Sequence, residues 1–445
     1  MKKAALHNLG CKVNAYETEA MQEMLEKAGY EIVPFKEGAD VYVINTCTVT
    51  NMADRKSRQM LHKAKKMNPE AIVVAAGCYV QAKKEDEPVD PSIDIVIGNN
   101  KKKELIEILN EYEREHKSGN LKEDEPLMEV IDINHTNEYE ELELSTTTEH
   151  TRAYIKVQDG CNQFCSYCII PYARGRVRSR DIYEVVEEVK RLVNEGYKEV
   201  VLTGIHLSSY GVDLDKDVDL LALIEAVNMV DGLKRIRLGS LEPRIVTEEF
   251  AKRISEMPKM CPHFHLSMQS GCDETLKRMN RRYTSDEFYE KCVLLRKYFD
   301  NPALTTDVIV GFPGETEEEF NKSYDFIDKV GFYETHVFKY SRRYGTRADK
   351  MPNQVKDEIK TKRSDKLIAL NKKHMAAFEK AYCNRDVEIL VEEDAIVGGR
   401  NVQVGHTKEY IKIALVSSEN LKNQIVKVHI PEDSEFFIEI WHYLY

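Results

Sequence analysis

Three cysteines close together in the sequence, Cys161, Cys165 and Cys168, have the spacing CxxxCxxC. Thiolates at this spacing can converge on one metal centre without help from distant parts of the chain. Three thiolates suit a [4Fe–4S] cluster that keeps one iron free of protein ligands, and an open iron can bind and activate a substrate. A structural zinc site normally takes four ligands, but no second CxxC pair or suitably spaced histidine lies nearby. The pattern therefore indicates an iron–sulfur cluster.

A second set of cysteines is dispersed along the chain: Cys11, Cys47 and Cys78 each follow a short apolar run, at a turn. Their separations, 36 and 31 residues, each approximate one strand–helix–strand unit. In a parallel sheet such positions gather at the carboxyl edge, where open α/β sheets bind ligands. One buried cysteine there would be ordinary packing. Three at equivalent positions predict a second three-thiolate cluster.

The other cysteines and the histidines show no comparable pattern. Cys261, Cys272, Cys292 and Cys383 are expected to pack in cores, and His206, His263 and His265 are left outside the catalytic set. Ten cysteines without an export signal are more typical of thiols and metal ligands than of disulfides. The longest apolar stretch, Ala71–Val80, is at most half a membrane span. These features predict a cytoplasmic protein with no membrane segment.

Residues 1–110 alternate between apolar runs and helical patterns, which is typical of an α/β domain with a parallel sheet. Strands are predicted at Ala4–Leu9, Val41–Asn45 and Ala71–Ala76, and helices at Asn14–Ala28 and Asp54–Met67. Asn14 and Glu17 have the spacing of a capping box, so we expect them to cap the first helix.

The alternation resumes further along the chain. Strands are predicted at Tyr154–Val157, Val200–Leu202, Arg235–Leu238, His263–Leu266, Thr306–Val310 and Thr335–Phe338. Six such steps suit a partial (β/α) barrel that binds ligands at the strand C-termini. After a long helix, five short runs predict a small antiparallel β-barrel: Val387–Val391, Asn401–Val404, Tyr410–Val416, Gln424–Ile430 and Phe436–Trp441. We predict domains at 1–110, 147–375 and 376–445, with a linker at 111–146.

The net charge of −12 is unevenly distributed. Residues 111–150 hold thirteen acidic and three basic residues, which is typical of a solvated linker, and the rest of the chain carries only −2. Basic patches are therefore still expected on the part of the chain outside this acidic segment. From Asn384 to Tyr445 the net charge is −5, which opposes RNA binding by the tail.

The CxxxCxxC motif resembles the signature of the radical S-adenosylmethionine superfamily, and the whole chain resembles its methylthiotransferase family. The stretches that carry the second resemblance are Cys11 with Asn14 and Glu17, Asn45-Thr46-Cys47, Gly77-Cys78, the run from Cys161 to Gly175, Ser267 to Cys272, and Met279 to Tyr283. The tail resembles the TRAM domain, an RNA-binding barrel of the oligonucleotide-binding type. The resemblance implies S-adenosylmethionine contacts from Tyr167, Thr203, Gly204, Gln269 and Gly311.

The family resemblance also implies a two-stage reaction that uses two S-adenosylmethionine molecules. One methylates sulfur at the auxiliary cluster on Cys11, Cys47 and Cys78. The other is cleaved at the [4Fe–4S] cluster of the CxxxCxxC motif, and the resulting radical activates a substrate carbon that captures the methylthio group. A low-potential donor such as flavodoxin or ferredoxin is implied as reductant, and we expect a monomer.

For the substrate, Thr203-Gly204-Ile205-His206-Leu207 resembles the branch that acts on N(6)-threonylcarbamoyladenosine beside the tRNA anticodon. The isopentenyladenosine branch usually has Gly-Gln-Asn there. Isopentenyladenosine, a ribosomal-protein aspartate and a non-catalytic electron carrier remain alternatives. The anticodon stem-loop is expected to contact Arg174, Arg176, Arg178, Arg281, Arg282 and Arg400. Further basic residues are Arg180, Arg278, Arg342 and Arg343. The alternatives are that these arginines form a solvated face or bind the carboxylate of the cofactor.

Overall fold

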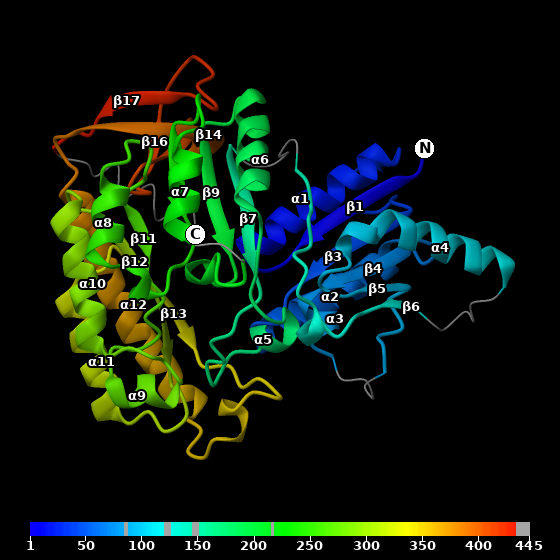
Figure 1. Ribbon diagram of the computed structural model, residues 1–445, viewed down its shortest axis with the longest axis horizontal. Helices are drawn as coiled ribbons and strands as arrows, with labels where there is room; N and C mark the ends of the chain where they lie inside the picture. Colours follow the sequence, from blue (N-terminus) through cyan, green and yellow to red (C-terminus); the bar gives the residue numbers. More distant parts are fainter. Residues whose placement is uncertain (84–87, 120–125, 145–150, 215–217, 433–445) are drawn as a thin grey trace.

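The computed structural model describes residues 1–83, 88–119, 126–144, 151–214 and 218–432. Figure 1 shows an N-terminal α/β domain, drawn in blue and cyan, beside a larger green and yellow α/β core. A small orange and red sheet lies over one end of the core strands. The predicted fold class is confirmed: a parallel α/β domain, a partial barrel and a small antiparallel β unit.

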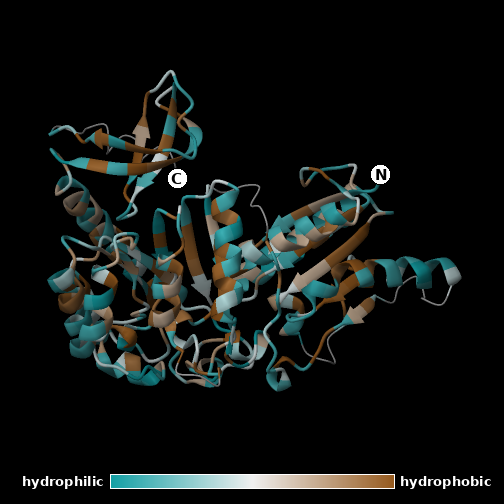
Figure 2. Cartoon of the chain, turned by 45° about the horizontal axis from the view of Figure 1, so that its top comes forward, coloured by the Kyte–Doolittle hydropathy of each residue, from teal (hydrophilic) through white to brown (hydrophobic). Residues whose placement is uncertain are grey.

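The N-terminal domain contains a six-stranded, all-parallel sheet in the order β2-β1-β3-β4-β5-β6. Its elements are β1 (Lys3–Asn8), α1 (Lys12–Lys27), β2 (Glu31–Ile32), β3 (Val41–Thr46), α2 (Asn51–Met67), β4 (Ile72–Gly77), α3 (Cys78–Gln81), β5 (Ile95–Ile97), α4 (Leu105–Ser118) and β6 (Leu127–Glu129). Every residue of β3 is buried, as expected for a strand with both sheet faces covered. Figure 2 shows its hydrophobic strands, in brown, lying between helices with hydrophilic faces.

Asn14 and Glu17 do not form the predicted capping box. Helix α1 begins at Lys12 and follows Cys11, which makes no side-chain cap. Both predicted capping residues lie one turn inside the helix and are buried. The Asn14 amide donates to the backbone carbonyls of Leu9 and Thr46, at 2.7 and 3.0 Å. The prediction was wrong because tertiary partners, absent from the local pattern, hold both side chains.

The described parts of the acidic segment, residues 111–119 and 126–144, include a helix end, a strand and buried residues of the N-terminal domain, which a solvated linker would lack. Helix α4 continues to Ser118, and β6 pairs with β5 in parallel. Leu142 and Leu144 are buried against α1, and Glu140 is also buried and accepts hydrogen bonds from backbone N–H groups. This structure was not predicted because the apolar residues of the acidic segment are few and widely spaced among charged ones, so the sequence shows no periodic pattern there.

The core contains six parallel strands with helices outside them, as predicted for a partial barrel. Its elements are β7 (Arg152–Asp159), α5 (Ile170–Ala173), β8 (Arg178–Ser179), α6 (Ile182–Asn194), β9 (Glu199–Gly204), α7 (Leu220–Asn228), β10 (Arg235–Leu238), α8 (Glu248–Ser255), β11 (His263–His265), α9 (Asp273–Arg278), α10 (Ser285–Tyr298), β12 (Ala303–Val310), α11 (Glu317–Val330) and β13 (Glu334–Lys339). Single bridges join β10 to the β11 region, and antiparallel β8 lies beside β7.

The starts of several helices follow directly from the sequence. Thr284 and Glu287 form a capping box at α10, and Thr316 and Glu319 form another at α11. Each threonine hydroxyl accepts a backbone N–H while the glutamate three residues later accepts the threonine's own N–H. These caps fix where α10 and α11 begin relative to the ends of the core strands.

The tail follows the long helix α12 and forms an antiparallel sheet in the order β16-β15-β14-β17. Its elements are α12 (Asp357–Lys380), β14 (Asp386–Val397), β15 (Arg400–Thr407), β16 (Lys412–Leu415) and β17 (Ile425–His429). A bulge after Val391 interrupts the register of β14, and such bulges bend a strand. The fifth predicted strand, Phe436–Trp441, lies outside the described residues.

Buried arginines attach the tail to the core. The Arg235 guanidinium donates to the carbonyls of Glu388 and His406, and that of Arg237 donates to the carbonyls of Thr407 and Lys408. Both arginines come from β10, so the tail sheet is anchored on the core rather than tethered only by α12. Within the part of the chain that the structure describes, no helix has the length and apolar character needed to cross a membrane.

Glu379, near the end of α12, should make stability depend on pH. Burial raises the pKa of its carboxyl to about 7, the Tyr333 hydroxyl lowers it and the Glu334 carboxylate raises it further. Because the folded-state pKa is raised, the stabilising contribution is complete below the unfolded pKa and is lost as pH rises through 7. Glu379→Gln should therefore stabilise the protein at pH 8 by about 1–3 kcal/mol and have little effect near pH 4.5.

Urea unfolding at the two pH values, followed by circular dichroism, measures this difference. Glu358→Gln, an exposed position in the first turn of the same helix, is the matched control and should change stability little at either pH. An equal effect of Glu379→Gln at both pH values would contradict the prediction.

Candidate active site

The three dispersed cysteines meet at the carboxyl edge of the N-terminal sheet. Cys11 lies three residues after β1, and Cys47 and Cys78 come directly after β3 and β4. These strands are parallel neighbours, so their ends lie side by side. Burial, with smaller contributions from the thiols of Cys78 and Cys11, raises the pKa of the Cys47 thiol to about 11. The adjacent strand ends thus bring the three cysteines to one edge of the sheet.

Two glycines allow the turns to pack closely around these sulfur atoms. Gly77 has φ +95°, and a Cβ there would lie 2.6 Å from Asn45 Oδ1. Gly10 has φ +110°, and its Cβ would lie 3.0 Å from Cys47 Sγ. Glycine adopts such left-handed conformations without steric cost. Since all ten cysteines, each within the described residues, are free thiols, this cradle fits a three-thiolate metal cluster.

The CxxxCxxC loop follows β7, at the carboxyl end of the first barrel strand. Gly160 has φ +70°, and a Cβ there would lie 1.7 Å from the Arg176 carbonyl oxygen, so only glycine fits this turn. The Cys161 N–H donates to the Gly175 carbonyl at 3.0 Å, which closes the loop at its base. Burial, with smaller contributions from the thiols of Cys165 and Cys161, raises the pKa of Cys168 to about 12. The three cysteines of the motif therefore share one loop at the end of β7.

Arg281 lies against the CxxxCxxC loop. Its guanidinium donates to Cys165 Sγ at 3.3 Å and to the Ser267 carbonyl at 2.9 Å. The same group lies 4.9 Å from the ring centre of Tyr283, and the tyrosine hydroxyl also donates to the Ser267 carbonyl. A fixed cation beside a thiol favours the thiolate, which is the form that binds metal. The donor set and its surroundings fit the predicted iron–sulfur cluster.

A buried ionic network connects the two cysteine trios. Arg174, which follows α5 just after the CxxxCxxC motif, donates to Glu17 Oε1 at 2.9 Å and to Asp159 Oδ2 at 3.0 Å. Its Nε also donates to Cys78 Sγ at 3.2 Å. Lys156 reaches both carboxylates, at 3.0 and 2.8 Å. Glu17 and Asp159 come from different domains, so the network fixes one trio relative to the other.

The network holds more positive than negative groups. Lys102 Nζ lies 3.2 Å from Glu17, and an Arg178 nitrogen lies 3.8 Å from Asp159. With Arg174 and Lys156, four cationic side chains share two carboxylates, whose pKa values these cations hold well below the usual range. Buried charge needs compensation. An anionic thiolate cluster beside Cys78 would supply it, which is a further sign that the edge fits a metal cluster.

A cavity of about 230 Å³ lies beside Cys168 of the CxxxCxxC motif. Its wall combines Tyr167, Cys168 and Gln269 from the core with Val49 and Thr50, the residues that closely follow Cys47. Gln269 has φ +71°, an uncommon conformation for a residue other than glycine. Its N–H donates to the Asp307 carbonyl at 2.8 Å, which holds this turn against β12. A molecule in this cavity would touch both halves of the candidate site.

Of the cofactor-binding candidates, Tyr167 and Gln269 line this cavity. Thr203 and Gly204 end the neighbouring strand β9, where a Cβ at Gly204 would meet the Gln158 side chain at 2.8 Å. Gly311 follows β12, but a Cβ there would lie 2.3 Å from Lys360 Cγ. The close approach that requires glycine at Gly311 is therefore to a lysine of α12.

The predicted RNA-contacting arginines divide into buried and exposed groups. Arg174 and Arg178 have no exposed surface and are held in the ionic network, so the expectation that they contact phosphate is corrected. Arg281 is half-buried beside Cys165. Arg176, Arg282 and Arg400 are exposed. Of the further basic residues, Arg180 is buried with Glu188, Arg278 pairs with Glu319, Arg342 pairs with Asp349 and Arg343 pairs with Asp54.

The ionic network was not predicted from the sequence. Lys156 lies in β7 between Ile155 and Val157, and all three are buried. A lysine between apolar residues of a strand implies a buried carboxylate partner, which was the available signal. Glu17 was singled out for another reason, as a helix cap, and Asp159 was not singled out, because no local pattern connects either residue to Arg174, their shared partner.

Family models match both α/β domains. The radical SAM superfamily model matches residues 155–327, and the uncharacterized protein family UPF0004 model matches residues 3–98. Among solved structures, the radical S-adenosylmethionine methyltransferase TsrM from Kitasatospora setae has a TM-score of 0.57 and 16% identity, and the match covers 78% of this chain and 77% of that one. At that identity the likeness concerns the fold.

Close relatives in sequence extend over nearly the whole chain. A threonylcarbamoyladenosine tRNA methylthiotransferase, MtaB, of Bacillus subtilis is 42% identical over 97% of this chain and 94% of its own. The protein of the same name from Aquifex aeolicus is 40% identical, over 88% and 93%. A tRNA-2-methylthio-N(6)-dimethylallyladenosine synthase of Clostridium botulinum is 34% identical, over 96% and 94%. The chain belongs to the methylthiotransferase family of radical S-adenosylmethionine enzymes.

Proposed function

We propose that this protein transfers a methylthio group to N(6)-threonylcarbamoyladenosine next to the anticodon of tRNA. The observation that carries the chemistry is the pair of cysteine trios at neighbouring strand ends of the two domains, linked by Arg174, which contacts both Cys78 and Asp159. Two relatives named for this substrate are 40–42% identical, and a third, from Thermotoga maritima, is 34% identical, as is the dimethylallyladenosine synthase of Clostridium botulinum. The two highest of these identities are thus both to proteins named for threonylcarbamoyladenosine. This ranking favours threonylcarbamoyladenosine over isopentenyladenosine.

We assign different tasks to the two trios. Cys161, Cys165 and Cys168 would hold the cluster that binds S-adenosylmethionine, and Cys11, Cys47 and Cys78 would hold the auxiliary cluster. When bound, these groups supply a hydrogen-abstracting radical and the sulfur to be donated. The chain would orient both from fixed strand ends, and the walls of the cavity would exclude water from the reacting atoms.

Tyr167 and Gln269 are the cofactor contacts that the cavity supports best, because both lie in its wall beside Cys168. Arg281 and Arg174 would each hold one sulfur ligand in place, at Cys165 and Cys78. Two S-adenosylmethionine molecules would be consumed in each turnover, one as methyl donor and one as radical source. A low-potential flavodoxin or ferredoxin would supply the electron.

The tRNA would contact the exposed arginines around the CxxxCxxC loop. Arg176 lies 4.6 Å from the ring centre of Phe164, and Asn280, two residues before Arg282, donates to the Phe164 carbonyl. Arg176 and Arg282 therefore belong to one surface, where guanidinium groups can bind successive phosphates. Arg400 lies in the anchored tail, and its contribution to the same RNA stays a prediction. A tRNA substrate places the enzyme in the cytoplasm, and we retain the monomer as the expected state.

Nucleoside analysis of tRNA from cells with and without the gene tests this function. Loss of the protein should abolish the methylthio form of threonylcarbamoyladenosine and leave the unmodified form to accumulate. Complementation with the wild-type chain or with Cys383→Ala should restore the product, whereas Cys161→Ala should not. Loss of the methylthio form of isopentenyladenosine instead would change the substrate. Unchanged tRNA nucleosides would contradict an RNA substrate.

A further inference from the structure

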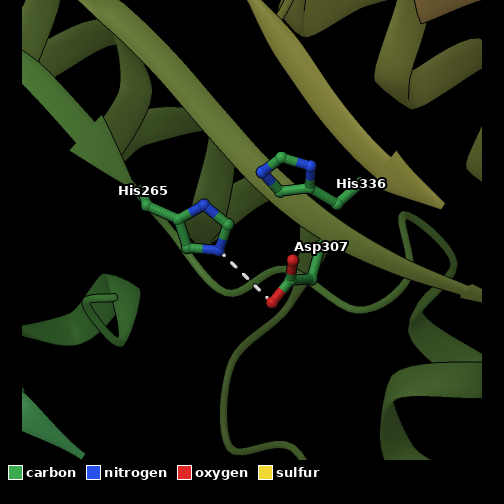
Figure 3. A group of neighbouring side chains, drawn as sticks. All are labelled: His265, Asp307 and His336. Atoms are coloured by element: carbon green, nitrogen blue, oxygen red, sulfur yellow. Dashed lines mark ion pairs between the residues drawn. The ribbon is translucent and has the colours of Figure 1, made fainter. Parts of the chain in front are cut away.

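Three potential metal ligands lie together on adjacent strands of the core, apart from the cysteines. Figure 3 shows His265, Asp307 and His336 on β11, β12 and β13, with the two imidazole rings and the carboxylate turned toward one another. We propose that these residues form a binding site for a divalent transition-metal cation of the zinc or iron(II) type. The proposal goes beyond the proposed methylthio transfer and uses none of the cysteines.

The sheet register brings the three side chains to one face. Asp307 is the direct parallel partner of His336, and Thr305 is the partner of His265. Because side chains two residues apart on a strand point to the same face, Asp307 lies on the same side as Thr305. The arrangement is therefore set by strand pairing, and it does not depend on a flexible loop.

The distances between the potential ligand atoms are close to those expected around a bound metal ion. One potential ligand atom from each residue lies within 4.8 Å of the other two. His265 Nε2 and Asp307 Oδ2 are 3.3 Å apart. Two ligands each about 2.0–2.1 Å from a tetrahedral zinc are separated by about 3.3 Å. This pair thus already has the spacing of two ligands on a shared cation, and His336 is the third residue within reach.

One outer contact orients His265 as metal-binding histidines usually are. His265 Nδ1 lies 3.0 Å from the Thr305 hydroxyl, and this partner leaves the lone pair of Nε2 available to a metal. His336 Nδ1 lies at the longer, ion-pair distance of 3.6 Å from Glu334 Oε1. Among the residues that the structure describes, His265 Nε2 has no hydrogen-bond partner of good geometry although it is buried.

Two histidines and one carboxylate are a donor set for zinc or iron(II), and they leave coordination positions open. Asp307 also lines the cavity whose wall includes Tyr167 and Cys168, so a cation bound by Asp307 would lie beside the candidate active site. An added cation would there accept a water or an anionic oxygen of a bound molecule. The competing account is a His265–Asp307 ion pair on which the His336 ring only stacks, with 5.6 Å between the two ring centres.

Zinc binding to the holoenzyme tests the proposal. Protein with both cysteine trios loaded with iron is dialysed anaerobically against zinc chloride, and zinc and iron per chain are measured by mass spectrometry. The wild type should retain about one zinc beyond the His265→Ala/His336→Ala variant at unchanged iron. His429→Ala, which removes a histidine paired with Asp386 in the tail, is the matched control and should retain zinc like the wild type.

X-ray absorption at the zinc edge distinguishes this site from capture by thiols. Nitrogen and oxygen neighbours at about 2.0–2.1 Å support the proposal, and sulfur neighbours at about 2.3 Å overturn it. Equal zinc content in the wild type and the double variant also overturns it and leaves the ion pair as the explanation. The half-exposed His336→Ala single variant should lose zinc without loss of fold, so misfolding of the double variant would not hide the answer.

Discussion

Replacing Cys161, Cys165 and Cys168 together with alanine should halve the iron bound after anaerobic reconstitution, from about eight to about four atoms per chain. The variant should form no 5′-deoxyadenosine from S-adenosylmethionine and no methylthiolated product. The physical reason is that these thiols lie together at the end of β7, beside Tyr167 and the cavity, while the other trio belongs to a separate sheet. Iron assay and chromatography of the nucleosides measure the three quantities.

The complementary triple variant at Cys11, Cys47 and Cys78 should lose the same amount of iron with a different functional result. Cleavage of S-adenosylmethionine should persist because the CxxxCxxC loop is intact, but product formation should stop because no sulfur is held at the sheet edge. A Cys261→Ala/Cys292→Ala variant removes buried core thiols outside both trios and should keep all of the iron.

Two outcomes would contradict this division of labour. Full iron retention in the Cys161, Cys165 and Cys168 variant would exclude the radical cluster from that loop. Product formation by the Cys11, Cys47 and Cys78 variant would exclude the sheet edge as the source of the sulfur. Loss of all iron from either variant would mean that neither site assembles without the other.

The cysteine positions could be predicted because each depends on information carried by the sequence. The CxxxCxxC spacing is local, and the dispersed trio follows from parallel-strand topology, which places successive strand ends at one edge. The alternation of apolar and helical segments was also sufficient for the six strands of the core. These features need only short-range patterns and the known geometry of a parallel sheet.

The partners of the trios could not be predicted in the same way. Glu17 has the local spacing of a helix cap, yet it is an ion-pair partner of a residue 157 positions away. Arg174 stands among other arginines and looks like part of a phosphate-binding surface, yet it is fully buried. Local patterns describe a side chain's neighbours in sequence, and a domain interface supplies neighbours that no local pattern contains.

Arg174 should be the most sensitive position outside the cysteines. Its guanidinium contacts Glu17, Asp159 and Cys78 without any exposed surface. Arg174→Met would leave two buried carboxylates with fewer partners and Cys78 without its donor. Removing one partner from a buried ionic network typically costs about 3–5 kcal/mol of stability. We therefore expect a large loss in the free energy of unfolding together with weaker binding of iron at the auxiliary trio.

Arg176→Met is the matched control, because Arg176 is exposed and lies two residues away. It should leave stability and iron content near the wild-type values. Arg174→Lys keeps the charge but loses the forked geometry that reaches two carboxylates and a sulfur, so it should fall between the two. Chemical unfolding and iron content of the three variants, measured under nitrogen, decide the matter. If Arg174→Met and Arg176→Met behaved alike, the network would not join the two cysteine sites.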